Sequence, residues 1–175
     1  SATIEELMEI KGIGKVKAIQ LKAICELAIR LSRPKISKGT VIKNTDQVAQ
    51  MVLEEFQYEK NETARVFLLN AKNRLMKIEN IALGGTSFVK LDVKTVVSSA
   101  IKVGANRLIL VHNHPSGDST PSQADIHFTD KLYNALNSFN IELIDHIVIG
   151  NMEYKSVFEY IEELCEKARQ GAENK

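Results

Sequence analysis

Two histidines, a serine and an aspartate stand close together between residues 112 and 125. They form the pattern His112-x-His114-x7-Ser122-x2-Asp125. In an extended chain, residues two apart point to the same side, so the imidazoles of His112 and His114 can converge on one point. Ser122 and Asp125 are three residues apart at the expected start of a helix and share a face. Two imidazoles and one carboxylate are typical of a catalytic zinc site with an open fourth position, whereas structural zinc sites are closed by four ligands.

The elements that flank this segment favour such a site. Residues 107–111 (RLILV) are the most strand-like run of the chain, and a loop rich in Pro, Ser and Gly follows them. Thr120 as the cap, Pro121 in the first turn and Gln123 three residues after the cap predict a long helix from about 121 to 138. The end of a buried strand is where α/β folds place their sites. A polar loop whose histidines only bond to backbone is the competing interpretation.

Helices and strands alternate along the chain after residue 44. The pattern predicts helices over about 46–56 (capped by Thr45), 92–103 (ending at Gly104) and 156–170, and strands over 63–69, 75–82 and 141–149, with a hairpin turn at 71–74 and a break at Gly84-Gly85. Such alternation indicates an α/β domain in which helices pack on a sheet.

The first 39 residues predict a helix, a tight turn and a second helix. Thr3 and Glu6 have the spacing of a capping box, Gly12-Ile13-Gly14 interrupts the run, and apolar residues recur at helical spacing from Lys15 onward. Residues 32–44 are polar and basic and contain Pro and Gly, which is typical of a linker. We therefore expect a helix-hairpin-helix element with the start of a linker over residues 1–39, and a metal-binding α/β domain over residues 40–175.

Charge differs between these two parts. Residues 1–39 carry eight Lys and Arg against four Glu, a net charge of +4, while the remainder carries 15 basic and 18 acidic residues, a net charge of −3. Gly12 and Gly14 would let backbone N–H groups at a helix start approach a phosphate, and Lys11, Lys15 and Lys17 add positive charge. This combination predicts contact with the DNA backbone without sequence readout. A hairpin that serves packing or binds a protein partner is the alternative.

Composition bounds the remaining possibilities. The 175 residues are 44% hydrophobic and 26% charged, which excludes disorder over most of the length. Neither a membrane-spanning run nor a leader peptide is visible. Cys25 and Cys165 cannot form a disulfide framework and indicate a reducing compartment, so we expect a cytoplasmic protein. Because the chain has no Cys-x-x-Cys, a metal site must use histidine and carboxylate ligands.

The pattern from His112 to Asp125 resembles the metal motif of the JAMM (JAB1/MPN+) metalloproteases. The longer string HNHPSGDSTPSQAD (112–125) is similar to the RadC family within that group, as is LIDHIVIG (143–150), and KGIGKVKAIQLKA (11–23) is similar to that family's helix-hairpin-helix element. This resemblance, which covers nearly the whole chain, implies a deaminase-like α/β/α sandwich. It also implies one zinc ion per chain, bound by His112, His114 and Asp125, a glutamate that activates water, and Ser122 beside the developing oxyanion.

Glu62 is the expected general base. It begins the segment ETARVFLL, which is similar to the Glu-Thr-x-x-aliphatic start of the corresponding strand in JAMM enzymes. The chemistry requires a carboxylate within hydrogen-bond reach of the attacking water, and a residue at a strand terminus can be held rigidly there. Glu59, in a polar turn, and Glu79, in the second strand, are rivals without support from the motif.

Other polar residues receive smaller roles. His127 is expected at the surface, and Asp118 fits the ligand spacing worse than Asp125. His146 is expected either to be a buried, hydrogen-bonded histidine or to support a metal ligand through its second ring nitrogen. Asn113 and Ser116 are expected to shape the loop.

The leading hypothesis is therefore a zinc-dependent hydrolase of the JAMM type that cleaves a peptide or isopeptide-like amide in a protein or peptide substrate. RadC-type proteins are traditionally labelled DNA-repair proteins, so the second hypothesis is a DNA-associated module with a vestigial or structural metal site. A metal-dependent nuclease is the third, although nucleases more often use two metals. The fourth is a non-haem iron protein, since two His and one carboxylate also suit Fe(II).

Overall fold

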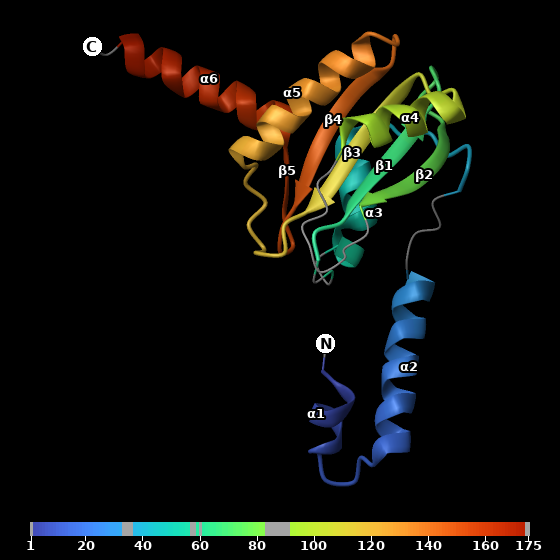
Figure 1. Ribbon diagram of the computed structural model, residues 1–175. Coiled ribbons are helices and arrows are strands. Elements are labelled where there is room, and N and C mark those ends of the chain that lie inside the picture. Colours follow the sequence, from blue (N-terminus) through green and yellow to red (C-terminus); the bar gives the residue numbers. More distant parts are fainter. Residues whose placement is uncertain (1, 33–36, 57–58, 60, 83–91, 174–175) are drawn as a thin grey trace. The chain divides into compact units, whose positions relative to one another are not determined.

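The computed structural model describes residues 2–32, 37–56, 59, 61–82 and 92–173. Its contacts divide the chain into two compact units, Ser1–Lys35 and Ile36–Lys175 (Figure 1). The predicted break at Gly84-Gly85 and residues 33–36 of the predicted linker lie outside the described residues. Among the helices that are described, none is both long and apolar enough to cross a membrane.

The N-terminal unit consists of two helices, α1 (Ile4–Met8) and α2 (Lys15–Ser32). The predicted capping box at Thr3 is confirmed: the Thr3 hydroxyl accepts a hydrogen bond from the Glu6 N–H, and the Glu6 carboxylate accepts one from the Thr3 N–H. These two bonds satisfy N–H groups that the first turn of a helix leaves free.

A five-stranded sheet forms the centre of the second unit, in the order β2-β1-β3-β4-β5. The strands are β1 (Ala64–Leu69), β2 (Leu75–Ala82), β3 (Arg107–Asn113), β4 (Glu142–Ile149) and β5 (Tyr154–Ser156). β1 runs antiparallel to both β2 and β3, β3 and β4 are parallel, and β5 returns antiparallel to β4. Four of these strands were predicted. The fifth has only three residues, too few to show an alternating pattern.

Helices cover both faces of the sheet (Figure 1). On one face, α3 (Thr45–Phe56) packs against alternate strand residues such as Phe67 and Ile109. On the other, α4 (Val93–Val103) and α5 (Gln123–Asn137) pack against the intervening residues such as Leu68 and Leu110. Because both faces are buried, the central strands are apolar throughout rather than alternating. With α6 (Val157–Glu173) at the C-terminal end, the domain is the predicted α/β/α sandwich.

Two expectations near the start of this unit were wrong. Asn44, not Thr45, caps α3, because the longer Asn44 side chain accepts the Gln47 N–H at 2.9 Å. The linker is also shorter than predicted: Thr40 and Ile42 make backbone hydrogen bonds of 2.8 Å to the β1–β2 hairpin. The Ile42 side chain is buried in the α3 face of the core, so this stretch belongs to the folded domain.

Candidate metal centre

β3 and the loop after it position the two histidines of the motif. His112 is the penultimate residue of β3 and is 2% exposed, on the face that α5 covers. His114 lies just beyond the strand, where its N–H donates to the Ile149 carbonyl of β4 at 2.9 Å. Residues two apart along the extended chain face the same side. The two imidazoles therefore meet, with 4.9 Å between their ring centroids.

The start of α5 brings Asp125 to the same point. Ser122 is the N-cap, and it forms a capping box in which its hydroxyl accepts from the Asp125 N–H and the Asp125 carboxylate accepts from the Ser122 N–H. The prediction that Thr120 caps this helix was wrong. The Thr120 N–H is bonded to the Asp118 carboxylate at 2.8 Å, so the loop is still turning there and the helix begins at Gln123.

Three potential ligand atoms converge in this arrangement. Nε2 of His112 lies 3.1 Å from Nε2 of His114, and the two nitrogens lie 3.2 and 3.3 Å from the two oxygens of the Asp125 carboxylate. Within the described part of the chain, His112, His114 and Asp125 are the one group of His, Cys, Asp or Glu side chains close enough to share a metal ion. The structure thus brings together the three residues that the motif singled out.

The chemistry of these atoms fits a cation. Nδ1 of His114 lies 2.8 Å from the Asp118 carbonyl; a carbonyl oxygen only accepts, so Nδ1 carries the hydrogen and neutral His114 presents a lone pair at Nε2. Two lone pairs and a carboxylate at this spacing repel one another unless a proton or a metal ion lies among them. Imidazole nitrogen and carboxylate oxygen are ligands that zinc accepts, so the residues present fit that ion.

The electrostatics of His114 and Asp125 agree with this interpretation. The hydrogen bond to Asp125 raises the pKa of His114 above its ordinary value, against the opposing effect of burial. Burial alone would raise the pKa of Asp125, but the adjacent imidazoles of His112 and His114 outweigh it and hold that pKa well below its usual range. The carboxylate is therefore ionised at neutral pH and available to a cation.

Glu62 lies beside this centre. The β1–β3 register pairs Ala64 with His112, and it continues one residue further, where the Asn113 N–H donates to the Thr63 carbonyl at 3.2 Å. Extending the antiparallel register by one more residue sets Glu62 opposite His114. The negative charge of Glu62 contributes to the raised pKa of His114. Its side chain is exposed and thus open to a water or a substrate.

The two rival glutamates differ in position. Glu79 lies in β2 opposite Val66 and pairs with Lys77, one strand removed from β3. Glu59 is closer: together with His114 it lines a polar pocket of about 270 Å³. Asn113, at the end of β3, binds the residues that precede β1, because its side-chain oxygen accepts the Thr63 N–H at 2.7 Å. Asn113 thereby holds the segment that carries Glu62 against the end of β3, where the loop that contains His114 begins.

Two residues that the motif did not include also shape the centre. Gly150 approaches the metal loop so closely that a Cβ there would lie 2.5 Å from the Gly117 carbonyl oxygen. Thr129, buried on α5, contacts both the Asp125 carbonyl and the ring of His146 at 2.6 Å. No sequence signal marks Thr129 except its position one helical turn after Asp125. His146 is fully buried and contacts the His112 ring, whereas His127 is exposed on α5.

The glycine turn proposed for DNA contact lies at the surface of the N-terminal unit. Gly12 has a φ of +93°, a left-handed conformation that favours glycine, and nothing lies within 4 Å of a Cβ built at Gly12 or Gly14. The side chains of Lys11 and Lys15 are exposed. Lys17 donates to the Gly12 carbonyl at 3.1 Å, so its ammonium stabilises the turn.

The sandwich and the His-x-His-x7-Ser-x2-Asp constellation define the class as a JAB-type domain, and comparison with known proteins agrees. The family model described as RadC-like JAB domain matches residues 42–163, and the chain belongs to this family. A UPF0758 protein of Moorella thermoacetica is 42% identical over 158 residues, which are 90% of this chain and 69% of that protein. A UPF0758 protein of Alkaliphilus metalliredigens is 42% identical over 156 residues, or 89% of this chain and 67% of that protein.

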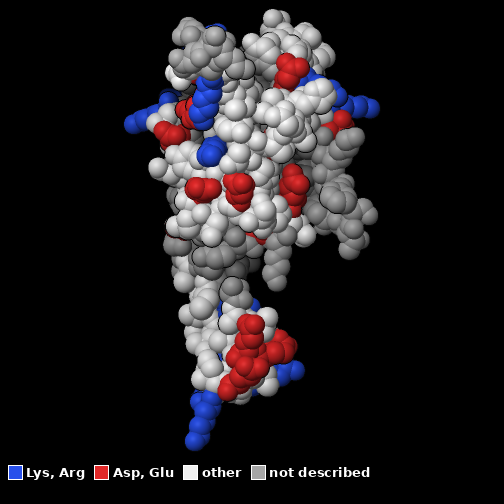
Figure 2. Space-filling model, turned by 90° about the vertical axis from the view of Figure 1, so that its left-hand side faces the viewer, with Lys and Arg blue, Asp and Glu red and all other residues white. Residues whose placement is uncertain are grey.

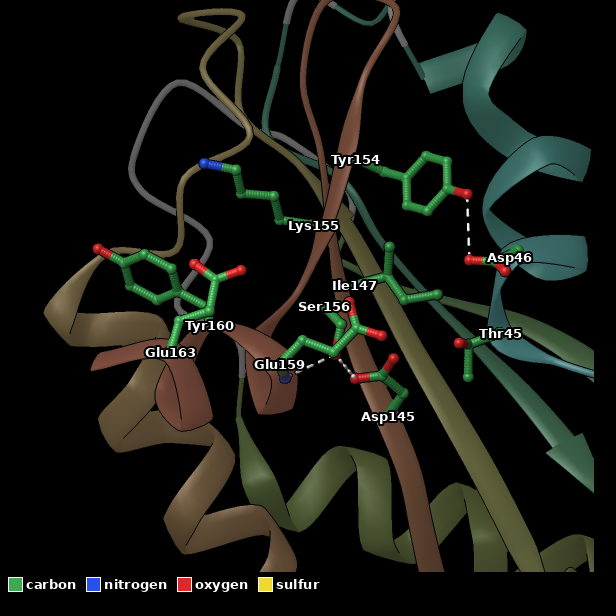
Figure 3. A pocket seen from close by; sticks show the side chains of 10 residues that line it. All are labelled: Thr45, Asp46, Asp145, Ile147, Tyr154, Lys155, Ser156, Glu159, Tyr160 and Glu163. Atoms are coloured by element: carbon green, nitrogen blue, oxygen red, sulfur yellow. Dashed lines mark hydrogen bonds between the residues drawn. The ribbon is translucent and has the colours of Figure 1, made fainter. Parts of the chain in front are cut away.

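A second polar pocket, of about 90 Å³, opens on the α3 side of the sheet (Figure 3). Asp145, 4% exposed, lies at its base, where its carboxylate accepts the Ser156 hydroxyl and the His146 N–H, each at 2.7 Å. Burial raises the pKa of Asp145 to about 6, with Glu159 adding to the rise. Asp46, which also lines the pocket, accepts the Tyr154 hydroxyl at 3.1 Å. This pocket lies on the opposite face of β4 from His146.

Replacing Asp145 with Asn should change how stability depends on pH. A carboxyl whose pKa rises from 3.8 in the unfolded chain to about 6 in the fold contributes stability below pH 4 that is lost as the pH rises through 6. The loss is about 3 kcal/mol. Urea unfolding should therefore show the wild type losing about that much relative to Asp145→Asn between pH 4 and pH 7. Asp130→Asn, an exposed carboxyl on α5, is the control; parallel profiles for wild type and Asp145→Asn would contradict the assignment.

Proposed function

We propose that this chain is a zinc-dependent hydrolase that cleaves a peptide or isopeptide-like amide in a protein or peptide substrate. The observation that carries the proposal is the convergence of His112, His114 and Asp125 beside the exposed carboxylate of Glu62. Three protein ligands leave a tetrahedral ion one position for water or substrate, which is the pattern of catalytic zinc sites. A purely structural site would be expected to offer a fourth protein ligand.

In this reaction the metal ion, Glu62 and Ser122 would each have a separate role. A zinc ion bound here would acidify a water molecule and polarise the substrate carbonyl. Glu62 accepts the proton of the attacking water and later delivers it to the leaving amine. Ser122 donates to the developing oxyanion; its hydroxyl first has to turn away from the Asp125 carboxylate, to which it donates at 2.6 Å. The polar pocket between Glu59 and His114 receives a part of the substrate next to the cleaved bond.

A metal-dependent cleavage screen tests this function. Purified protein loaded with zinc would be incubated with peptides and with isopeptide-linked protein conjugates, before and after chelation, with Glu62→Gln as the matched inactive control. Cleavage that requires metal and Glu62 supports the proposal. Cleavage that survives chelation, or equal cleavage by the Glu62→Gln protein, would contradict it.

The N-terminal unit supports a second candidate function, contact with the DNA backbone. The supporting observation is the exposed turn at Gly12 and Gly14, which leaves the first N–H groups of α2 without an intrahelical acceptor. Such a helix start attracts phosphate. On the face of the N-terminal unit that Figure 2 shows, acidic side chains lie among the basic ones. We therefore propose a small contact at the turn instead of a broad basic surface.

DNA binding of this kind should be weak and should fall steeply with salt. Each phosphate contact lowers the slope of log K against log salt concentration by about 0.9, so contacts by Lys11 and Lys15 together predict a slope of about −2. Fluorescence anisotropy with duplex DNA of unrelated sequences would measure it. Lys11→Ala with Lys15→Ala should abolish binding, whereas Lys131→Ala on α5 should not. A salt-independent affinity, or one unaffected by the double substitution, would exclude this function.

A further inference from the structure

A continuous chain of buried hydrogen bonds connects two of the candidate metal ligands behind the site. It runs from the Asp125 carbonyl to the Thr129 hydroxyl at 2.6 Å, from there to Nδ1 of His146 at 2.6 Å, and from Nε2 of His146 to Nδ1 of His112 at 2.8 Å. His112, Thr129 and His146 are each 2% exposed or less. This series of hydrogen bonds crosses three elements, since it joins α5 to β4 and β4 to β3.

The hydrogens of this chain can be arranged in one direction only. The Asp125 carbonyl can only accept, so the single hydrogen of the Thr129 hydroxyl points to it. The hydroxyl oxygen then accepts from Nδ1–H of His146. Nε2 of neutral His146 is left as an acceptor and receives the Nδ1–H of His112.

The reverse direction fails at both ends. If the Thr129 hydroxyl donated to His146, two oxygens would face each other at 2.6 Å with no hydrogen between them. His112 would then also carry its hydrogen on Nε2, the nitrogen that faces His114 and Asp125, and could not bind a cation there.

We propose that Thr129 and His146 are positioning residues that fix the tautomer and orientation of His112, so that its Nε2 lone pair faces the metal. This inference rests on the proposed metal centre and extends it to residues that never touch the ion. It also gives a reason for a histidine at position 146 within an apolar strand: the position needs a side chain that donates from one ring atom and accepts at the other. The edge of the Phe128 ring, with its centroid 6.2 Å from that of His146, helps to hold the plane of the imidazole.

The decisive comparison is between Thr129→Val and Thr129→Ser. Valine preserves the shape of threonine but has no hydroxyl, so it interrupts the series of hydrogen bonds while keeping the packing. Serine keeps the hydroxyl but loses a methyl group, so it weakens the packing while keeping the chain. Loss of a partner behind a metal ligand typically lowers metal affinity about 10–100-fold. Zinc affinity, measured by competition with a chelator, should therefore fall about 10-fold or more in Thr129→Val and stay within about 3-fold of the wild type in Thr129→Ser.

A second measurement reads the hydrogens directly. Long-range ¹H–¹⁵N NMR of the metal-free protein should show His112 and His146 with the hydrogen on Nδ1, and Thr129→Val should shift the Nδ1 resonance of His146. Wild-type zinc affinity in Thr129→Val, weaker binding in Thr129→Ser than in Thr129→Val, or hydrogens on Nε2 would each overturn the inference. A wild-type protein that bound zinc but hydrolysed nothing would count against the proposed function but not against the positioning role of Thr129 and His146. If the wild type bound no zinc, the NMR experiment would still test that positioning role.

Discussion

Replacing His114 with Ala is expected to remove stoichiometric zinc from the protein and to leave the fold intact. The imidazole is one of three candidate ligands, and its loss should weaken binding by more than the roughly 100-fold seen when a supporting partner is removed. The side chain lies beyond the end of β3 and is only partly buried, so the sheet and its two apolar cores do not depend on it. Elemental analysis and equilibrium competition would measure the metal, and far-UV circular dichroism the fold.

His127→Ala is the matched control, because it removes an exposed imidazole from α5 near Asp125. This variant should retain full zinc. Combining His114→Ala with Asp125→Ala should abolish binding altogether, and a double variant that kept full metal would show that the ligand assignment is wrong. The same analysis on the wild type separates zinc from iron, since two histidines and a carboxylate can also hold Fe(II).

Glu62→Gln is expected to lower the rate of the chemical step at least about a hundredfold while zinc content stays near that of the wild type. Glutamine keeps the size of the side chain but cannot take up a proton, and a general acid or base usually contributes about 10²–10⁴-fold. Zinc should remain because the charge of Glu62 is not needed to hold the ion, and substrate binding should also change little. Single-turnover cleavage of a substrate from the screen would measure the step.

Glu59→Gln is the sharpest comparison, because Glu59 lines the pocket beside His114 and carries the same charge. A large loss in Glu59→Gln with an unaffected Glu62→Gln would move the general base to Glu59. Loss of zinc in Glu62→Gln would make Glu62 a fourth ligand and the site a closed one. Ser122→Ala should retain zinc and lose about 10²–10³-fold in rate if its hydroxyl serves the oxyanion.

Local sequence rules predicted the elements well and their ends less well. Gly104 ends α4 in a left-handed conformation with a φ of +69°, as its position after an apolar helical run indicated. At α5, however, the pattern predicted Thr120 as the cap and the structure uses Ser122, although both residue types are good caps. Ser122 is the cap because the loop is hydrogen-bonded at Gly117 to the β4–β5 turn. This contact places the start of the helix two residues after the position that the pattern predicted.

The sequence by itself indicated the candidate ligands, because His112, His114 and Asp125 lie on one short segment whose extended and helical spacings are fixed by local geometry. It also determined the α/β class, through the alternation of apolar strands and amphipathic helices. Only the tertiary structure decided what surrounds the ligands. The pairing of β1 with β3 sets Glu62 opposite His114, although the two residues are far apart in the sequence. Thr129 and His146 meet behind His112 because α5 packs on β4. Contacts between distant segments depend on strand order and register, which no local spacing encodes.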